Sequence, residues 1–158
     1  MKKIKVGVIG GGFIGPVHVE SLRRLGYIEV VAIATTNAAG AQALAQKLCI
    51  PKGYGDYMEL IADEQVEAVH ICAPNYLHYS MAKAAILAHK HVVCDKPLAM
   101  TSAQGEELLA LAQEAGVVAA VSFNLRYYPL LHQVKAMIEA GELGEIYAVN
   151  GSYQQDWL

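Results

Sequence analysis

The sequence predicts an α/β fold with a doubly wound parallel sheet, and two observations support this prediction. Short apolar runs alternate with segments of helical spacing, in the order β-α-β-α-α-β-α-β-α-β. The apolar runs are continuous rather than alternating, as expected for strands that helices cover on both faces. Right-handed crossovers between such strands produce a parallel sheet with helices on each side.

The first two strands and two helices follow from the start of the chain. Residues 4–9 and 28–36 are short runs rich in β-branched side chains, which predicts two strands. Residues 13–26 place apolar side chains near helical spacing and end at a glycine, so a helix is expected there. Asn37 is a suitable N-cap for a second helix at 38–49.

The middle of the chain continues this alternation of strands and helices. Residues 51–56 contain a proline and two glycines and are expected to form a loop. Asp56 can cap a short helix at 57–63. The apolar run at 66–73 predicts the third strand, and the segment 76–90 predicts the helix that follows it.

Two further strands complete the predicted sheet. The apolar runs at 91–95 and 117–123 are expected to be the fourth and fifth strands. Thr101, with a glutamine three residues later, forms a plausible capping box for a helix at 102–116 that ends at a glycine.

After the fifth strand the character of the sequence changes. Residues 127–144 predict one more helix, and residues 145–153 are expected to form a strand that no later strand can pair with. An unpaired strand edge favours association with a second copy, and the side chains of Tyr147, Tyr153 and Trp157 would add apolar surface. We therefore expect a homo-oligomer.

Composition argues against several classes of protein. The net charge is −3, from 12 basic and 15 acidic residues, and clustered basic residues that would bind nucleic acid or a membrane surface are lacking. No apolar stretch is long enough to span a membrane. Cys49, Cys72 and Cys94 lack metal-ligand spacing, so no metal is expected. Buried, reduced thiols at Cys72 and Cys94 indicate a cytoplasmic protein.

The stretch GGGFIGP between the first strand and the first helix is the main functional motif. It contains G-x-G-x-x-G at Gly10, Gly12 and Gly15, in the strand–turn–helix context of a dinucleotide-binding Rossmann fold. These glycines permit the tight turn, leave room for a pyrophosphate and let the helix approach the strand. Phe13 and Ile14 complete the loop, whose backbone N–H groups are expected to face the phosphates.

The signal that chooses between NAD and NADP is missing from the sequence. An acidic residue at the end of the second strand would bind the adenosine ribose. The chain has Thr35, Thr36 and Asn37 at this position, all neutral, and no arginine follows. We therefore expect these residues to contact a dinucleotide that is either NAD or NADP.

Three longer segments carry a resemblance to a known family. VGVIGGGFIGPVH, ICAPNYLHYSMAKAAILAHKHVVCDKPLAMT and SFNLRYYPLLHQVKAMIEAGELGEIYAVNGSY resemble the Gfo/Idh/MocA oxidoreductase family, over the whole chain. The resemblance implies a Rossmann domain at 1–124. It also implies that residues 125–158 are the connecting helix and first strand of a truncated α+β domain, which in the family binds substrate and mediates oligomer contacts.

The resemblance also assigns residues after the third predicted strand. The motif APN places Ala73, Pro74 and Asn75 beside the nicotinamide half of the cofactor, with His78 one turn into the following helix. An ordinary structural role for His78 is an equally strong alternative.

The motif DKP resembles the family's EKP, whose lysine contacts the substrate hydroxyl. Lys96 is therefore the expected catalytic residue, and its place at the carboxyl end of a central strand agrees with the ligand crevice of such sheets. Asp95 replaces the usual glutamate and is expected to contact the cofactor through a shorter side chain. Asn124, in NLRYYP, is expected near the cofactor.

These inferences lead to one main hypothesis and two alternatives. The main hypothesis is an NAD(P)-dependent oxidoreductase that transfers a hydride between nicotinamide and a hydroxyl-bearing carbon of a sugar, polyol or inositol-like substrate. This chain would be its cofactor-binding portion, with little activity alone. The alternatives are a non-catalytic dinucleotide-binding module, such as a redox sensor, and a structural subunit that has lost its ligand.

Overall fold

A computed structural model of the chain describes residues 3–154. Its strands are β1 (Ile4–Ile9), β2 (Ile28–Ala34), β3 (Lys52–Tyr54), β4 (Ala68–Ile71), β5 (His91–Cys94) and β6 (Ala119–Val121). Its α-helices are α1 (Ile14–Arg24), α2 (Ala38–Lys47), α3 (Tyr57–Ala62), α4 (Asn75–Leu87), α5 (Ser102–Ala115) and α6 (Pro129–Glu139). A 3-10 helix, η1, covers Asn124–Tyr127.

The strands form one sheet in the order β3-β2-β1-β4-β5-β6, and every neighbouring pair is parallel. The chain moves outward from β1 to β3, then returns to the other side of β1 and continues outward to β6. The predicted doubly wound parallel sheet is therefore confirmed. Its order reverses between β1 and β4, which is where ligands bind in sheets of this kind.

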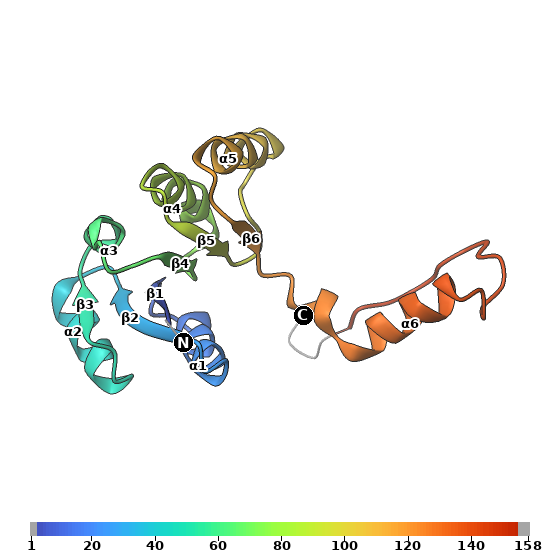
Figure 1. Ribbon diagram of the computed structural model, residues 1–158, viewed down its shortest axis with the longest axis horizontal. Coiled ribbons are helices and arrows are strands. Elements are labelled where there is room, and N and C mark those ends of the chain that lie inside the picture. Colours follow the sequence, from blue (N-terminus) through green and yellow to red (C-terminus); the bar gives the residue numbers. More distant parts are fainter. Residues whose placement is uncertain (1–2, 155–158) are drawn as a thin grey trace. The chain divides into compact units, whose positions relative to one another are not determined.

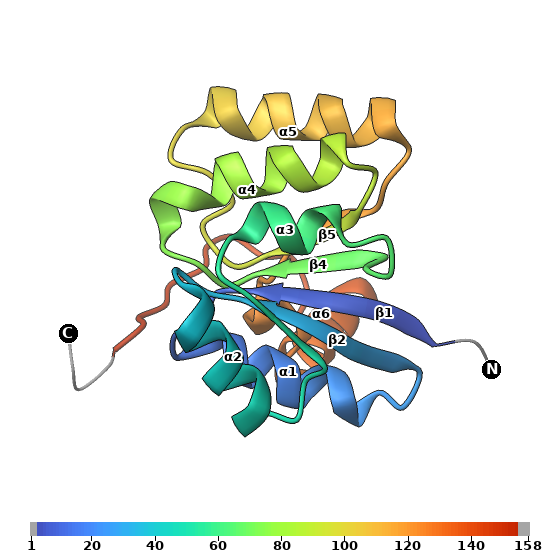
Figure 2. The ribbon, with the colours of Figure 1, turned by 90° about the vertical axis from the view of Figure 1, so that its left-hand side faces the viewer.

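Helices cover the sheet on both faces, as Figure 2 shows. On one face, α1 and α2 enclose a core in which Val19 and Leu22 of α1 belong to the same buried cluster as Val8 and Ile33 of the sheet. On the other face, α3, α4 and α5 form a second core with the sheet (Figures 1 and 2). This arrangement explains why the strands are continuously apolar.

Local capping signals in the sequence identify the helix starts correctly. The Asn37 side chain accepts a hydrogen bond from Gly40 N at 2.8 Å, and Asp56 accepts one from Met58 N at 2.9 Å. The Thr101 hydroxyl accepts a hydrogen bond from Gln104 N, in the first turn of α5, at 3.3 Å. These bonds satisfy N–H groups that a helix N-terminus leaves without a partner.

The region 51–56 was expected to be a loop, and this expectation is wrong. Lys52–Tyr54 forms the edge strand β3, in parallel register with Ala32, Ile33 and Ala34 of β2. Only three residues pair, so the segment is too short to show a strand pattern of its own. A Cβ at Gly53 would lie 2.6 Å from the carbonyl oxygen of Ala41, which explains the glycine at this position.

The chain divides into two compact units, Met1–Ser122 and Phe123–Leu158. The second unit contains η1 and α6, and α6 is followed by Gly141 at φ +75°. The strand expected at 145–153 is not formed, because these residues pair with no other strand among those described. Tyr147 and Tyr153 are exposed, and Trp157 lies outside the described residues.

The cysteines behave as the sequence predicts. Cys72 and Cys94 are buried and Cys49 is exposed, and all three are free thiols.

Within residues 3–154, no helix combines the length and the apolar character that are needed to cross a membrane. The same residues contain no group of three or more metal-ligating side chains that is placed to hold an ion.

Candidate functional site

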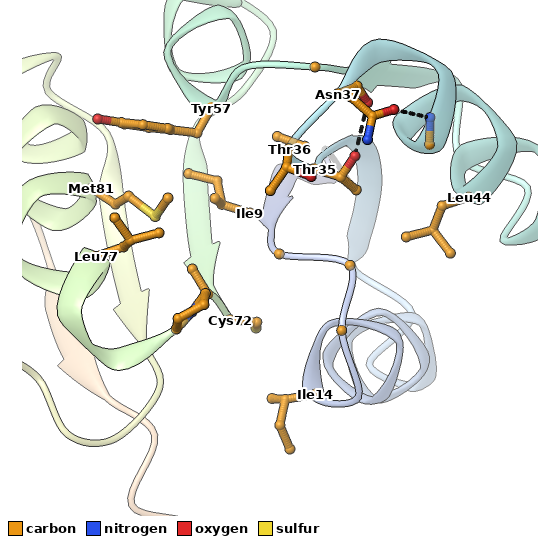
Figure 3. Close-up of a pocket in the computed structure, with 18 of the residues that line it drawn as sticks. Ile9, Ile14, Thr35, Thr36, Asn37, Leu44, Tyr57, Cys72, Leu77 and Met81 are labelled. Atoms are coloured by element: carbon orange, nitrogen blue, oxygen red, sulfur yellow. Dashed lines mark hydrogen bonds between the residues drawn. The ribbon is translucent and has the colours of Figure 1, made fainter.

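A cleft of about 1170 Å³ opens at the edge of the sheet where the parallel strands end. The glycine loop after β1, the residues after β2 and β4, and Asp95 after β5 all line it. In Figure 3, Thr35, Thr36, Asn37 and Leu44 lie on the opposite side of the cleft from Cys72, which follows β4, and from Leu77 and Met81 of α4. The cleft therefore joins segments that are far apart in the sequence.

Backbone hydrogen bonds extend the sheet ladder beyond the ends of its strands and hold these loops in place. Gly10 N donates to Ala34 O at 2.9 Å, and Cys72 N donates to Ile9 O at 2.7 Å. Asp95 N donates to Ile71 O at 2.9 Å. The first residues of three loops are thus fixed by the same ladder that aligns the strands.

The glycine loop is shaped by contacts that only glycine permits. Gly10 has φ +109°, and a Cβ there would overlap the carbonyl group of Cys72. A Cβ at Gly15 would overlap the carbonyl oxygen of Gly10. By contrast, a Cβ at Gly12 would meet no protein atom within 4 Å, although Gly12 lines the cleft. The protein's own packing therefore does not require a glycine at position 12.

The N-terminus of α1 faces the cleft without a side-chain cap. Its N-cap, Phe13, makes no capping hydrogen bond, whereas α2, α3 and α5 each receive one from a polar side chain. The N–H groups in the first turn of α1 have no intrahelical partner. Such groups, together with the helix dipole, attract anions such as phosphate.

The residues after β2 form a neutral wall of the cleft. The Thr35 hydroxyl donates to Asn37 O at 3.1 Å, and the Asn37 side chain caps α2 (Figure 3). Thr36 is exposed and also lines the cleft. No carboxylate follows β2, in agreement with the sequence.

The residues after β4 and β5 form the opposite wall. Ala73, Pro74, Asn75 and Asp95 line the cleft, and their contact with the cofactor stays a prediction. The Asp95 carboxylate accepts a hydrogen bond from Lys96 N at 2.9 Å. Lys96 itself is exposed and lies outside the cleft lining.

Four predicted site residues do not line the cleft: Gly15, His78, Lys96 and Asn124. The His78 side chain is 0% exposed and packs behind the wall, so it is not available for the contact with a cofactor that was expected. Asn124 belongs to the second compact unit, and its role stays a prediction.

Several lining residues were not identified from the sequence. Leu44 and Lys47 come from α2, Tyr57 from α3, and Leu77 and Met81 from α4. In α2 the lining positions recur at helical spacing, which is the one signal that would have suggested them. The α4 positions alternate between core and cleft, and the sequence pattern does not distinguish the two.

Burial controls the ionisation of the histidines and thiols near the cleft. His18 Nδ1 of α1 lies 3.0 Å from His70 Nδ1 of β4. Burial lowers the pKa of His70 to about 4, and His18 acts in the same direction. Burial also lowers the pKa of His18, although Asp95 opposes this shift. Burial raises the pKa of the Cys72 thiol to about 12, so Cys72 is a poor nucleophile.

A parallel sheet of this strand order, with a glycine-rich turn at the point where the order reverses, defines a Rossmann-type domain. Residues 4–123 match the family GFO_IDH_MocA, described as an oxidoreductase family with an NAD-binding Rossmann fold. The chain belongs to this family, and the resemblance found in its sequence is confirmed.

Named relatives and a solved structure support the assignment. The chain is 38% identical to inositol 2-dehydrogenase from Salmonella typhimurium, over 95% of its length and 46% of that protein. It is 33% identical to D-xylose 1-dehydrogenase (NADP(+)) 2 from Haloferax volcanii, over 93% of its own length and 45% of that protein. The solved structure of levoglucosan dehydrogenase in complex with NADH and levoglucosan matches the chain with a TM-score of 0.86 and 30% identity. The match covers 90% of this chain and 41% of that one. The chain therefore spans less than half the length of these relatives.

The low pKa of His70 predicts that acid destabilises the fold. Below pH 6.5 the unfolded chain binds a proton at this histidine, whereas the folded chain does so only near pH 4. The free energy of unfolding should therefore fall through this window, by at most about 1.4 kcal/mol per pH unit from this group. We expect His70→Asn to show a weaker fall in urea unfolding between about pH 7.5 and about pH 5.

The matched control for this experiment is His132→Asn, which removes a histidine from exposed α6. It should retain the fall in the free energy of unfolding that His70 causes. An equal pH dependence for His70→Asn and the unchanged chain would contradict the prediction.

Proposed function

We propose that this chain is the cofactor-binding portion of an NAD(P)-dependent oxidoreductase. The enzyme would transfer a hydride between nicotinamide and a hydroxyl-bearing carbon of a sugar, polyol or inositol-like substrate. The observation that carries the proposal is the glycine loop, which opens onto the cleft where the order of the sheet reverses. The names of the inositol, xylose and levoglucosan dehydrogenases support the substrate class.

The residues present fit a dinucleotide. The open space at Gly12 accommodates a pyrophosphate, and the uncapped first turn of α1 supplies N–H donors to it. Thr35 and Thr36 would lie at the adenosine end, and Pro74, Asn75 and Asp95 at the nicotinamide end. Neutral residues after β2 accept either ribose form, so the cofactor is NAD or NADP.

A bound nicotinamide would supply the hydride acceptor or donor. Oxidation of an alcohol also releases the hydroxyl proton, and Lys96 Nζ is proposed to exchange this proton with the substrate. Lys96 directly follows Asp95, which lines the cleft, and its exposure leaves the amine free to meet a substrate. Asp95 would orient the lysine through the hydrogen bond that it accepts from Lys96 N.

A non-catalytic dinucleotide sensor is the alternative that shares the same cleft. It requires the glycine loop but no amine to transfer a proton. A lysine directly after the cleft residue Asp95 therefore supports the enzyme. This 158-residue chain alone is expected to bind cofactor with little turnover, because the relatives that it matches are about twice as long.

A Cβ at Gly12 should weaken dinucleotide binding without weakening the fold. We expect Gly12→Ala to raise the Kd for NADH or NADPH at least about tenfold in calorimetry, because the methyl group occupies pyrophosphate space. Gly105→Ala is the matched control, since a Cβ there also meets no atom within 4 Å.

In contrast, Gly10→Ala should lower the free energy of unfolding, because its φ is +109° and the Cys72 carbonyl blocks a Cβ. Absence of binding for all four nicotinamide dinucleotides by the folded, unchanged chain would overturn the proposed function.

Removal of the Lys96 amine should slow chemistry rather than cofactor binding. In the oxidoreductase that carries this chain, we expect Lys96→Met to lower kcat by about 100-fold or more, while the Kd for NADH changes little. Lys135→Met, in exposed α6, is the control and should keep full turnover. Unchanged turnover in Lys96→Met would favour the sensor.

We also propose that the protein is cytoplasmic and self-associates through residues 145–153. Three free cysteines support the first point, and the exposed side chains of Tyr147 (87%) and Val149 (87%) support the second.

Light scattering should detect a dimer or larger species. Tyr147→Ser combined with Val149→Ser should shift it toward monomer, whereas a monodisperse monomer of the unchanged chain would argue against self-association.

A further inference from the structure

His78 is an unusual residue in this fold. Among the residues that the structure describes, it is the one polar side chain that is fully buried, with 0% exposure. It lies in the first turns of α4, directly behind the wall of the cleft. Burial of a polar ring is costly unless its nitrogens are hydrogen-bonded.

Both ring nitrogens of His78 have a partner, and both partners are backbone carbonyls. Nδ1 lies 2.6 Å from Pro97 O, and Nε2 lies 2.7 Å from Ala73 O. A carbonyl oxygen only accepts hydrogen bonds, so each nitrogen must carry a hydrogen for both bonds to form.

The two carbonyls belong to the two loops that form one wall of the cleft. Ala73 lines the cleft just before Pro74 and Asn75. Pro97 directly follows Lys96, the proposed catalytic residue. A single buried ring therefore connects the loop after β4 to the loop after β5.

The other bonds of the β5 loop show what His78 adds. Asp95 N donates to Ile71 O at 2.9 Å, and the Asp95 carboxylate accepts from Lys96 N at 2.9 Å. These bonds hold the backbone on the N-terminal side of Lys96. The bond from His78 to Pro97 O holds it on the C-terminal side.

We infer that His78 is a positioning residue, which fixes the Lys96 loop against the Ala73 loop by donating to both carbonyls. This inference rests on the proposed function for the role of Lys96. The two hydrogen bonds of His78 that connect the loops do not depend on that function. Without the ring, the carbonyls of Ala73 and Pro97 lose the donor that it supplies. The backbone just after Lys96 then loses its hydrogen bond to α4.

The first test uses the unchanged chain and needs no cofactor. Nitrogen-15 NMR of the imidazole should show a hydrogen on both ring nitrogens of His78 in the folded protein. A nitrogen without a hydrogen would mean that one of the two bonds is absent, and would overturn the inference. Because no variant is involved, this measurement remains decisive even where a substitution prevents folding.

The second test measures the order of the loop. We expect His78→Phe, which keeps a planar ring without donors, to speed hydrogen exchange at Lys96 N and Leu98 N at least about tenfold. The amide of Val93, inside β5, should keep its protection. Ser80→Ala, on the exposed side of α4, is the control and should leave all three amides unchanged. Unchanged exchange in His78→Phe would overturn the inference.

The third test separates positioning from mere stability. In the oxidoreductase that carries this chain, His78→Gln restores one donor group and should recover part of the kcat lost in His78→Phe. The Kd for NADH, measured by calorimetry, should change less than about threefold in both variants. Equal kcat per folded molecule in all three proteins would overturn the positioning role. A chain that binds no dinucleotide but shows the exchange effect would refute the proposed function alone.

Discussion

The close backbone approach at the turn between β1 and α1 is the constraint on which the rest of the site depends. At Gly10 a side chain would run into the carbonyl group of Cys72, and at Gly15 it would run into Gly10 itself. With no Cβ at either position, the turn lies directly against the end of β4. The start of α1 therefore faces the point where the strand order reverses. Side chains at these two positions would push the turn away from the end of β4.

Three histidines, two half-buried and one fully buried, show how the same side chain can have different structural roles. His18 and His70 bond each other between α1 and β4, and burial keeps the pKa of His70 well below its ordinary value. This pair joins a helix to the sheet as neutral rings. His78 instead bonds two carbonyls, so it needs hydrogens on both nitrogens.

Much of the fold was predictable because its signals are local. Asn37 and Asp56 cap the helices expected of them, since a side chain and an amide two or three residues later are neighbours in any helix start. The glycine spacing placed the cleft on the correct edge of the sheet. The edge strand β3 was missed because its three residues are held in a strand by pairing with β2, and their own sequence gives no strand signal. The strand expected at 145–153 failed for the same reason, since strands exist only as pairs.

The sequence by itself determined the fold class, the glycine turn and the residues that follow the five predicted strands, because apolar periodicity and glycine geometry act over a few residues. Only the tertiary structure decided which of those residues share the cleft. It brought Leu77 into the lining and placed His78, one residue later, behind it. It also brought the carbonyls of Ala73 and Pro97 to one ring. Such contacts depend on how the parallel strands align, and no local pattern encodes that alignment.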